Sequence, residues 1–124
     1  MSAEAISRPW PTELEFDRKA KLLRIAFDDG AAFEIPFELL RVESPSAENK
    51  GHGPNPPPPP TGKANVNVTR ADAVGRYAVR ISFDDGHDTG LYSWDLLYDL
   101  GREKDDRLRV YRETLAQRAL RDEA

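Results

Sequence analysis

The sequence predicts an α+β fold, with an antiparallel β-sheet core made from a duplicated β-hairpin–helix unit and a C-terminal amphipathic helix. Residues 23–30, Leu-Arg-Ile-Ala-Phe-Asp-Asp-Gly, match residues 79–86, Val-Arg-Ile-Ser-Phe-Asp-Asp-Gly, at six of eight positions. Residues 35–40 then align with residues 92–97 after an offset of one residue. A repeat of this kind favours two similar units that share one core, rather than a long array.

The first unit reads as a hairpin followed by a helix. Apolar and polar residues alternate over residues 13–17 and again over residues 23–27, which is the period of half-buried strands. Asp28-Asp29-Gly30 supplies a turn, since glycine accepts a positive φ and aspartate caps turns with its own side chain. Residues 33–35 continue as the return strand, and a short helix is expected over residues 37–41.

A proline- and glycine-rich segment, residues 44–64, separates the two units. It contains five consecutive prolines, residues 56–60, which favour polyproline II and cannot donate to a sheet ladder. We therefore expect a long surface loop. Its simplest interpretation is an insertion of variable length, and the alternative is a docking strip for aromatic grooves.

The second unit repeats the same order of elements. Alternating residues predict strands over residues 65–69 and 77–83, and Asp84-Asp85-Gly86 supplies the second turn. Residues 89–92 form the return strand, and a helix follows over residues 94–100.

The two helices of the second half have recognisable ends and faces. Ser93 is a good N-cap, and Gly101 stands where a C′ glycine would end the helix. The chain thus divides into a domain over residues 11–101 and a helical extension over residues 102–124. The extension has a helical apolar stripe, which we expect to pack on the sheet, with a partner-binding or dimerising helix as the alternative. The stripe consists of Leu108, Tyr111, Leu115 and Ala119.

Composition excludes several classes of protein. The 124 residues carry a net charge of −4, and basic residues are scattered among acids, so we expect no nucleic-acid partner. No apolar stretch reaches the length of about 18 residues that a membrane span needs, and no signal peptide is evident, so a cytoplasmic protein is expected. The chain has no cysteine, which excludes disulfides, thiolate metal sites and cysteine nucleophiles.

Two histidines are the main candidates for chemistry. His52 and His87 lie beside glycines and near carboxylates, so His52, His87 and Asp85 are candidate metal ligands, and His87 with Asp85 is a candidate acid–base centre. The Asp-Asp-Gly sequence occurs in both units, however, and turn formation explains its carboxylates. Ser44 or Ser46 beside a histidine would make a hydrolytic pair, but neither serine sits in a nucleophile elbow.

Aromatic residues gather near the second turn. Tyr92, Trp94 and Tyr98 are most simply core or packing residues. Together with His52 and His87, Tyr92 and Trp94 are also candidates for a ligand or partner surface.

Residues 44–48, 51–54 and, above all, 77–94 resemble the gamma-butyrobetaine hydroxylase-like N-terminal domain family. The last of these blocks contains Tyr-Ala-Val-Arg and Phe-Asp-Asp-Gly-His-Asp-Thr-Gly-Leu-Tyr-Ser-Trp. The resemblance covers about residues 11–101. It implies a small bacterial protein of unknown function, related to a domain that precedes the catalytic domain of 2-oxoglutarate-dependent carnitine-pathway hydroxylases and that is attached to P-loop iron–sulfur cluster carriers.

The resemblance also implies a comparison with a zinc site. In the hydroxylases the domain is similar to a zinc-stabilised unit with three cysteines and one histidine. Here Ser44, Ser46 and Asn49 stand at the cysteine positions, and His87 alone matches a ligand. Hydroxyl and amide groups are poor zinc ligands beside thiolates, so no cofactor is expected.

The sequence therefore predicts a non-enzymatic binding or adaptor module without the catalytic barrel of the hydroxylases. Protein partners are expected, and the family contexts imply a setting in iron–sulfur cluster assembly or oxygenase pathways. A metal-binding protein using His52 and His87, and a small enzyme centred on His87 and Asp85, are the alternatives.

Overall fold

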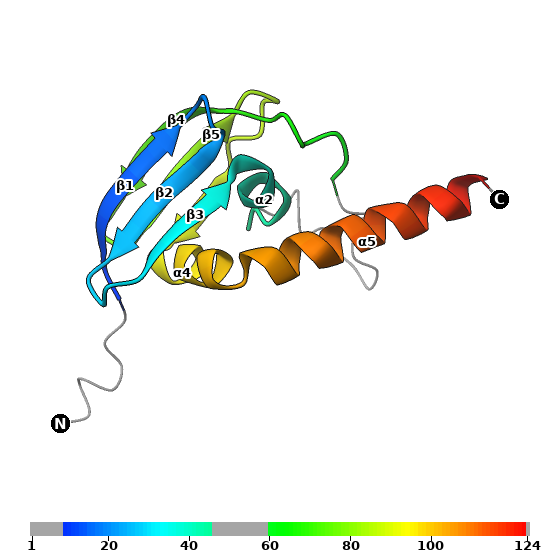
Figure 1. Ribbon diagram of the computed structural model, residues 1–124. Helices are drawn as coiled ribbons and strands as arrows, with labels where there is room; N and C mark the ends of the chain where they lie inside the picture. The colour runs from blue at the N-terminus through cyan, green and yellow to red at the C-terminus, as the bar shows by residue number, and fades with distance from the viewer. Residues whose placement is uncertain (1–8, 46–59, 124) are drawn as a thin grey trace.

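Two three-stranded antiparallel sheets form the body of the protein (Figure 1). The computed structural model describes residues 9–45 and 60–123. Sheet A has the order β1 (Pro11–Asp17), β2 (Leu22–Phe27), β3 (Ala32–Pro36). Sheet B has the order β4 (Val68–Val74), β5 (Ala78–Phe83), β6 (Gly90–Ser93). The predicted α+β fold with antiparallel sheets is confirmed.

A single core lies between the sheets, because the central strands alternate as the sequence predicts. In β2 and β5 every second side chain is buried, and the intervening ones face outward. The inward residues of the two central strands are Leu23, Ile25, Phe27, Val79, Ile81 and Phe83. Ile35 of β3 and Tyr92 of β6 join the same cluster and are fully buried.

The described residues include three helices: α2 (Phe37–Val42), which follows sheet A, and α4 (Trp94–Arg102) and α5 (Lys104–Glu123), which follow sheet B. The Ser93 hydroxyl accepts a hydrogen bond from the Leu96 backbone N–H at 3.1 Å, so the predicted N-cap is present. Gly101, by contrast, lies inside α4 rather than after it, and its place is explained by a close contact with Phe33. The interpretation of Gly101 as a C′ residue was wrong.

The long helix α5 packs mainly on α2 and α4, not on the sheets as expected. Leu108 and Tyr111 are buried, but Leu115 is only half-buried and Leu120 is 69% exposed. Its C-terminal part extends away from the body (Figure 1). Within residues 9–45 and 60–123, no helix is long and apolar enough to span a membrane.

The repeat extends to individual hydrogen bonds. In the first unit the Asp28 backbone N–H donates to the Trp10 carbonyl at 2.8 Å, and the Trp10 N–H donates to Asp28 Oδ1 at 3.1 Å. In the second unit Asp84 and Asn67 make the same two bonds, at 2.9 and 3.1 Å. Trp10 and Asn67 are therefore equivalent positions.

The helix starts are equivalent as well. The Phe37 N–H donates to the Lys21 carbonyl at 2.9 Å, and the Trp94 N–H donates to the Tyr77 carbonyl at 3.1 Å. Phe37 and Trp94 are the first residues of α2 and α4, so Lys21 and Tyr77 are also equivalent. The turn glycines that follow β2 and β5 have φ values of 92° and 91°, a region that favours glycine.

Each turn is tied to the helix of the other unit. Arg41 of α2 donates to Asp85 at 2.8 Å, and Tyr98 of α4 donates to Asp29 at 2.7 Å. Arg41 and Tyr98 stand at the same place in their helices, four residues after the first helical residue. The two units thus exchange equivalent contacts across a pseudo-twofold arrangement.

Candidate functional site

The structure brings Ser44 and His87 together in the interior. Ser44 follows α2 and is fully buried, and His87 follows the second turn and is 7% exposed. Ser44 Oγ and His87 Nε2 are 2.8 Å apart and form a hydrogen bond. The two residues are 43 positions apart in the chain, so this contact depends on the packing of one unit against the other.

Tyr92 extends this buried polar chain. Its hydroxyl donates to the Leu40 carbonyl at 2.5 Å, and the Ser44 hydroxyl also hydrogen-bonds to it. Either Ser44 Oγ or His87 Nε2 can donate in their mutual hydrogen bond, depending on the tautomer of His87. Burial raises the pKa of Tyr92 well above its usual range.

Asp85 anchors the same region from the surface side. Its carboxylate accepts from Lys63 Nζ at 2.6 Å, from Arg41 Nε at 2.8 Å and from the His87 backbone N–H at 3.0 Å. Although partial burial opposes ionisation, these hydrogen bonds hold the pKa of Asp85 below its usual value. Asp85 therefore fixes α2, the second turn and the segment before β4 to one another.

We expect the substitution Asp85→Asn to lower the free energy of unfolding by about 1–2 kcal/mol at neutral pH, because charge-assisted hydrogen bonds are lost. The folded pKa lies below the unfolded one, so this stabilisation is present above pH of about 4 and disappears as the pH falls through the folded pKa. Urea unfolding between pH 7 and pH 2.5 checks this. The difference between wild type and D85N should narrow on acidification.

A suitable control is Asp88→Asn, because Asp88 is exposed and its side chain makes no ion pair with other described residues. D88N should follow the wild-type profile at every pH. If D85N lowers the free energy of unfolding by the same amount at pH 7 and pH 2.5, the lowered pKa of Asp85 is not the source of the stabilisation.

The hydrolytic pair and the metal site predicted around His87 can each be compared with the structure. Ser44 and His87 do form the contact that a hydrolytic pair needs, but both are buried, which keeps a substrate from Ser44 Oγ. Among the described residues, no three His, Cys, Asp or Glu side chains gather as metal ligands. His52 lies outside the described residues, so its pairing with His87 stays a prediction.

The zinc that the family resemblance implies does not fit the donors the structure shows. Ser44 and His87 satisfy each other directly, and a hydroxyl is a weak partner for zinc. Ser46 and Asn49, the other two substituted positions, lie outside the described residues.

The predicted ligand surface of His87, Tyr92 and Trp94 does not form as one surface. Tyr92 is fully buried, and β6 separates His87 from Trp94. The Trp94 indole donates to the Arg76 carbonyl at 2.8 Å, and its ring packs beside Trp10 instead.

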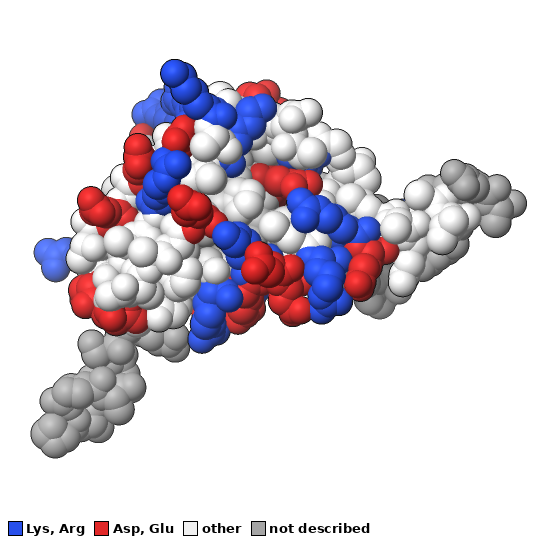
Figure 2. All heavy atoms as spheres, viewed as in Figure 1, with Lys and Arg blue, Asp and Glu red and all other residues white. Residues whose placement is uncertain are grey.

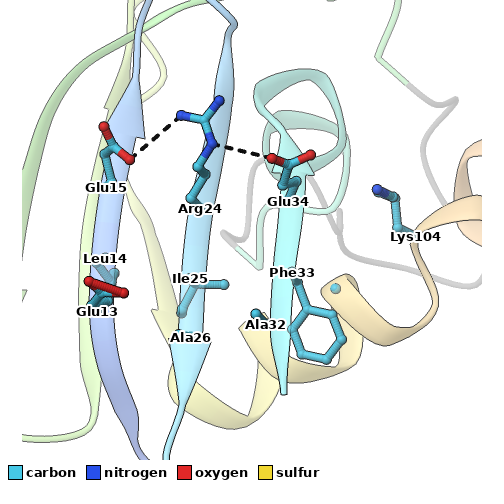
Figure 3. A pocket seen from close by; sticks show the side chains of 11 residues that line it. Glu13, Leu14, Glu15, Arg24, Ile25, Ala26, Ala32, Phe33, Glu34 and Lys104 are labelled. Carbon is cyan, nitrogen blue, oxygen red and sulfur yellow. Dashed lines mark hydrogen bonds and ion pairs between the residues drawn. The ribbon is translucent and has the colours of Figure 1, made fainter. Parts of the chain in front are cut away.

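A separate hollow lies on the outer face of sheet A (Figure 3). This outer groove has a volume of about 770 Å³ and runs from β1 across β2 and β3 to the junction of α4 and α5. The side chains that define it are Glu13, Glu15, Arg24, Ala26, Ala32, Phe33, Glu34 and Lys104.

A charged row crosses the outer groove. Arg24 lies at its centre, 3.2 Å from Glu34 and 3.6 Å from Glu15 (Figure 3). Arg24 also lies 2.7 Å from Asp17. These carboxylates hold the guanidinium in one orientation. Figure 2 shows acidic and basic side chains interspersed on this face of the molecule, without a broad area of one sign.

A row of small apolar residues lies beside the charged one (Figure 3). Ala26 of β2 is paired with Ala32 of β3, so two neighbouring outward positions carry only a methyl group. Phe33 and the α4–α5 junction form the wall. Glu13 and Lys104 form no ion pair with another described residue, so the groove presents one free carboxylate and one free ammonium.

Sequence reasoning missed the outer groove, although one signal was present. The alternation over residues 23–27 puts Ala26 on the side of the strand opposite Leu23, Ile25 and Phe27, and the register that sets Ala26 beside Ala32 follows from the Asp-Asp-Gly turn. The equivalent hollow on sheet B is smaller, about 420 Å³, and has Ser82 and Leu91 among its lining residues.

Comparisons with known proteins agree with the fold. Two proteins solved by NMR in solution are 48% and 39% identical, with TM-scores of 0.77 and 0.78. The matches cover 92% and 91% of this chain, and 85% and 89% of those chains. A crystal structure from Acidithiobacillus ferrooxidans, of a protein with unknown function in the DUF971 family, is 34% identical with a TM-score of 0.64 and covers 77% of this chain and 98% of that one. No curated protein matches the chain.

A family model described as gamma-butyrobetaine hydroxylase-like, N-terminal, matches residues 14–98. The match spans both hairpin–helix units, and the resemblance drawn from the sequence is confirmed. The chain belongs to the gamma-butyrobetaine hydroxylase-like N-terminal domain family.

Proposed function

We propose that this protein is a non-enzymatic binding module that holds a partner protein on the outer face of sheet A. The observation that carries the proposal is the outer groove. The methyl groups of Ala26 and Ala32 line its floor, which lies between charged side chains. Some of these charges are held in ion pairs, and others have no ion-pair partner among the described residues. Partner-binding surfaces combine an apolar centre with a polar rim in this way.

The lining of the outer groove defines the partner's chemistry. Ala26 and Ala32 leave room for an apolar side chain of the partner, which Phe33 would flank. The unpaired Glu13 carboxylate attracts a basic group at the β1 rim, and the unpaired Lys104 ammonium attracts an acidic group at the helical rim. We therefore propose a protein segment with an apolar residue between charges of opposite sign.

The contacts of His87 and Asp85 support a binding role over the two alternatives, a metal-binding protein and a small enzyme. Ser44 and His87 bond to each other in the core, and Asp85 is bonded to two cationic side chains. These contacts give His87 and Asp85 structural tasks, and we propose that the chain holds no zinc. We propose a cytoplasmic protein, as the sequence composition leads us to expect, and a setting in iron–sulfur cluster assembly or oxygenase pathways, which the family resemblance implies.

Site-specific photo-crosslinking tests the proposal. Benzoylphenylalanine is introduced at Glu15, at the β1 rim of the outer groove, and in a control at Thr89, in the equivalent hollow of sheet B. Irradiation in cells should give a discrete protein adduct from position 15 that position 89 does not give. Equal adducts from both positions, or no protein adduct from position 15, would overturn the proposal.

A further inference from the structure

Three aromatic side chains form a cluster outside the outer groove. The aromatic cluster consists of Trp10, Tyr77 and Trp94, from the segment before β1, the β4–β5 turn and the start of α4. The Trp10 ring lies 5.7 Å from Tyr77 and 6.4 Å from Trp94, both edge to face. Trp10 is 44% exposed and Tyr77 is 67% exposed, so the cluster presents its rings to solvent.

The two exposed aromatic residues are held in place by hydrogen bonds of their backbones, not of their side chains. Trp10 is held through its backbone, which bonds to Asp28 in both directions. Tyr77 is held through its carbonyl, which accepts from the Trp94 N–H. The Trp10 indole N–H and the Tyr77 hydroxyl make no hydrogen bond with the described residues, whereas the Trp94 indole N–H does. Two hydrogen-bond donors that the described residues do not use therefore lie on exposed rings that pack edge to face.

The other unit shows that the fold does not require these aromatics. Its equivalent of Trp10 is Asn67, which donates to the Arg18 carbonyl at 3.3 Å. Its equivalent of Tyr77 is Lys21, which donates to the Asn65 carbonyl at 2.9 Å. The same backbone contacts thus form with polar side chains, and the exposed tryptophan and tyrosine need another explanation.

We propose that the aromatic cluster is a binding site for proline in the polyproline II conformation, and that its occupant is the proline run 56–60 of a second copy of this chain. Exposed Trp and Tyr rings form the ridges between which proline rings pack. A polyproline II backbone has no internal hydrogen bonds, so its carbonyls accept from outward donors such as an indole N–H and a phenol. This proposal is independent of the outer groove.

The position of Pro60, the last residue of the proline run, favours binding to a second copy of the chain over binding within the same copy. The Pro60 carbonyl accepts from Tyr111 of α5 at 2.5 Å, and Lys63 bonds to Asp85, which follows β5. Tyr77 precedes β5, and a six-residue strand is about 20 Å long. Four residues of any chain reach at most about 14 Å even when fully extended, so the four residues before Pro60 cannot cover this distance. In Figure 1 the chain enters β1 on the side of the molecule opposite the end of α5.

A peptide with the sequence of residues 54–62 tests the site, with a control peptide in which serine replaces the five prolines. In ¹⁵N-labelled protein, we expect the Trp10 indole resonance to shift saturably with the proline peptide and not with the serine peptide. The double variant W10N/Y77K installs the residues found at the equivalent positions, so it should keep its melting temperature within a few degrees. Its affinity for the peptide should fall at least tenfold, and Y77F should lose part of the affinity.

Sedimentation velocity tests whether a second copy of the chain occupies the aromatic cluster. The wild-type chain should associate as its concentration rises, and both W10N/Y77K and the variant P56S/P57S/P58S/P59S should remain monomeric. If the peptide shifts no Trp10 resonance, the binding site is wrong. If the peptide binds but the wild-type chain stays monomeric at millimolar concentration, the second copy is not the occupant, and a proline-rich segment of another protein takes its place. Association that persists in both variants also overturns the second-copy assignment.

Discussion

Replacing Tyr92 by alanine is expected to lower the free energy of unfolding by about 3–5 kcal/mol, the largest effect that we predict for a single side chain. Tyr92 is the largest of the fully buried side chains, and its ring lies in the core between the two sheets. Its hydroxyl also bonds to the Leu40 carbonyl and to Ser44, which come from the other unit. The substitution therefore removes packing and a link between the units together.

The variant Tyr92→Phe separates these two contributions. It keeps the ring but leaves the buried Leu40 carbonyl without its donor, which costs about 1–3 kcal/mol. Tyr98→Phe is the control, because the Tyr98 hydroxyl bonds to Asp29 at the surface and should matter less. Chemical denaturation measures all three. A Y92A deficit below about 1 kcal/mol would contradict the core role of this residue.

The pH dependence gives an independent check on Tyr92. Its folded pKa is raised by burial, so its stabilising contribution is complete below the unfolded pKa of about 10 and is lost as the pH rises above that value. Wild type should lose stability between pH 9.5 and pH 11.5 more steeply than Y92F. Parallel profiles for the two proteins would rule out this effect.

Replacing Gly101 by alanine is the second large effect that we predict, a loss of about 1–3 kcal/mol despite the better helix propensity of alanine. A Cβ atom at Gly101 would lie 2.4–2.6 Å from three atoms of Phe33, including Phe33 Cβ, so the ring cannot simply rotate away. Thermal and denaturant unfolding of G101A measure the loss.

A double variant shows whether Phe33 is the cause. In a Phe33→Gly background, which removes Phe33 Cβ together with the ring, the further change Gly101→Ala should be neutral or stabilising, because the clash is gone and helix propensity alone remains. A G101A deficit of the same size in both backgrounds would mean that another contact limits this position.

The hairpins and Gly101 show how much of the fold could be predicted from the sequence. The Asp-Asp-Gly repeat predicted both hairpins, their turns and the helices that follow, because turn chemistry and strand alternation are local. Gly101 was misread, since a glycine near a helix end is most simply a C′ residue. Its contact with Phe33 arises only when α4 packs on sheet A.

The start of sheet B shows a related limit. A strand was expected over residues 65–69, but β4 begins at Val68 and continues to Val74. Val66 is buried without belonging to the strand, and the small residues Ala71 and Ala73 give β4 little apolar alternation. Pairing with β5, which no local pattern encodes, sets where this edge strand ends.

The candidate sites could be predicted only in part, and the comparison of the two units explains why. His87 and Asp85 were identified, but the Ser44–His87 bond joins residues that meet only after the units pack. The outer groove and the aromatic cluster were not identified, because each collects residues from three or more segments. Both surfaces differ between the units, whereas the turn and helix contacts are shared.

The most direct test of the central claim, that the outer face of sheet A is the binding surface, is to fill the groove and measure partner capture. Benzoylphenylalanine is placed at position 104, at the helical rim, in wild-type, Ala32→Trp and Thr89→Trp backgrounds. Positions 32 and 89 are both exposed, so both variants should fold as the wild type does. We predict that A32W abolishes the protein adduct and that T89W leaves it unchanged. An adduct that survives in A32W would contradict the claim.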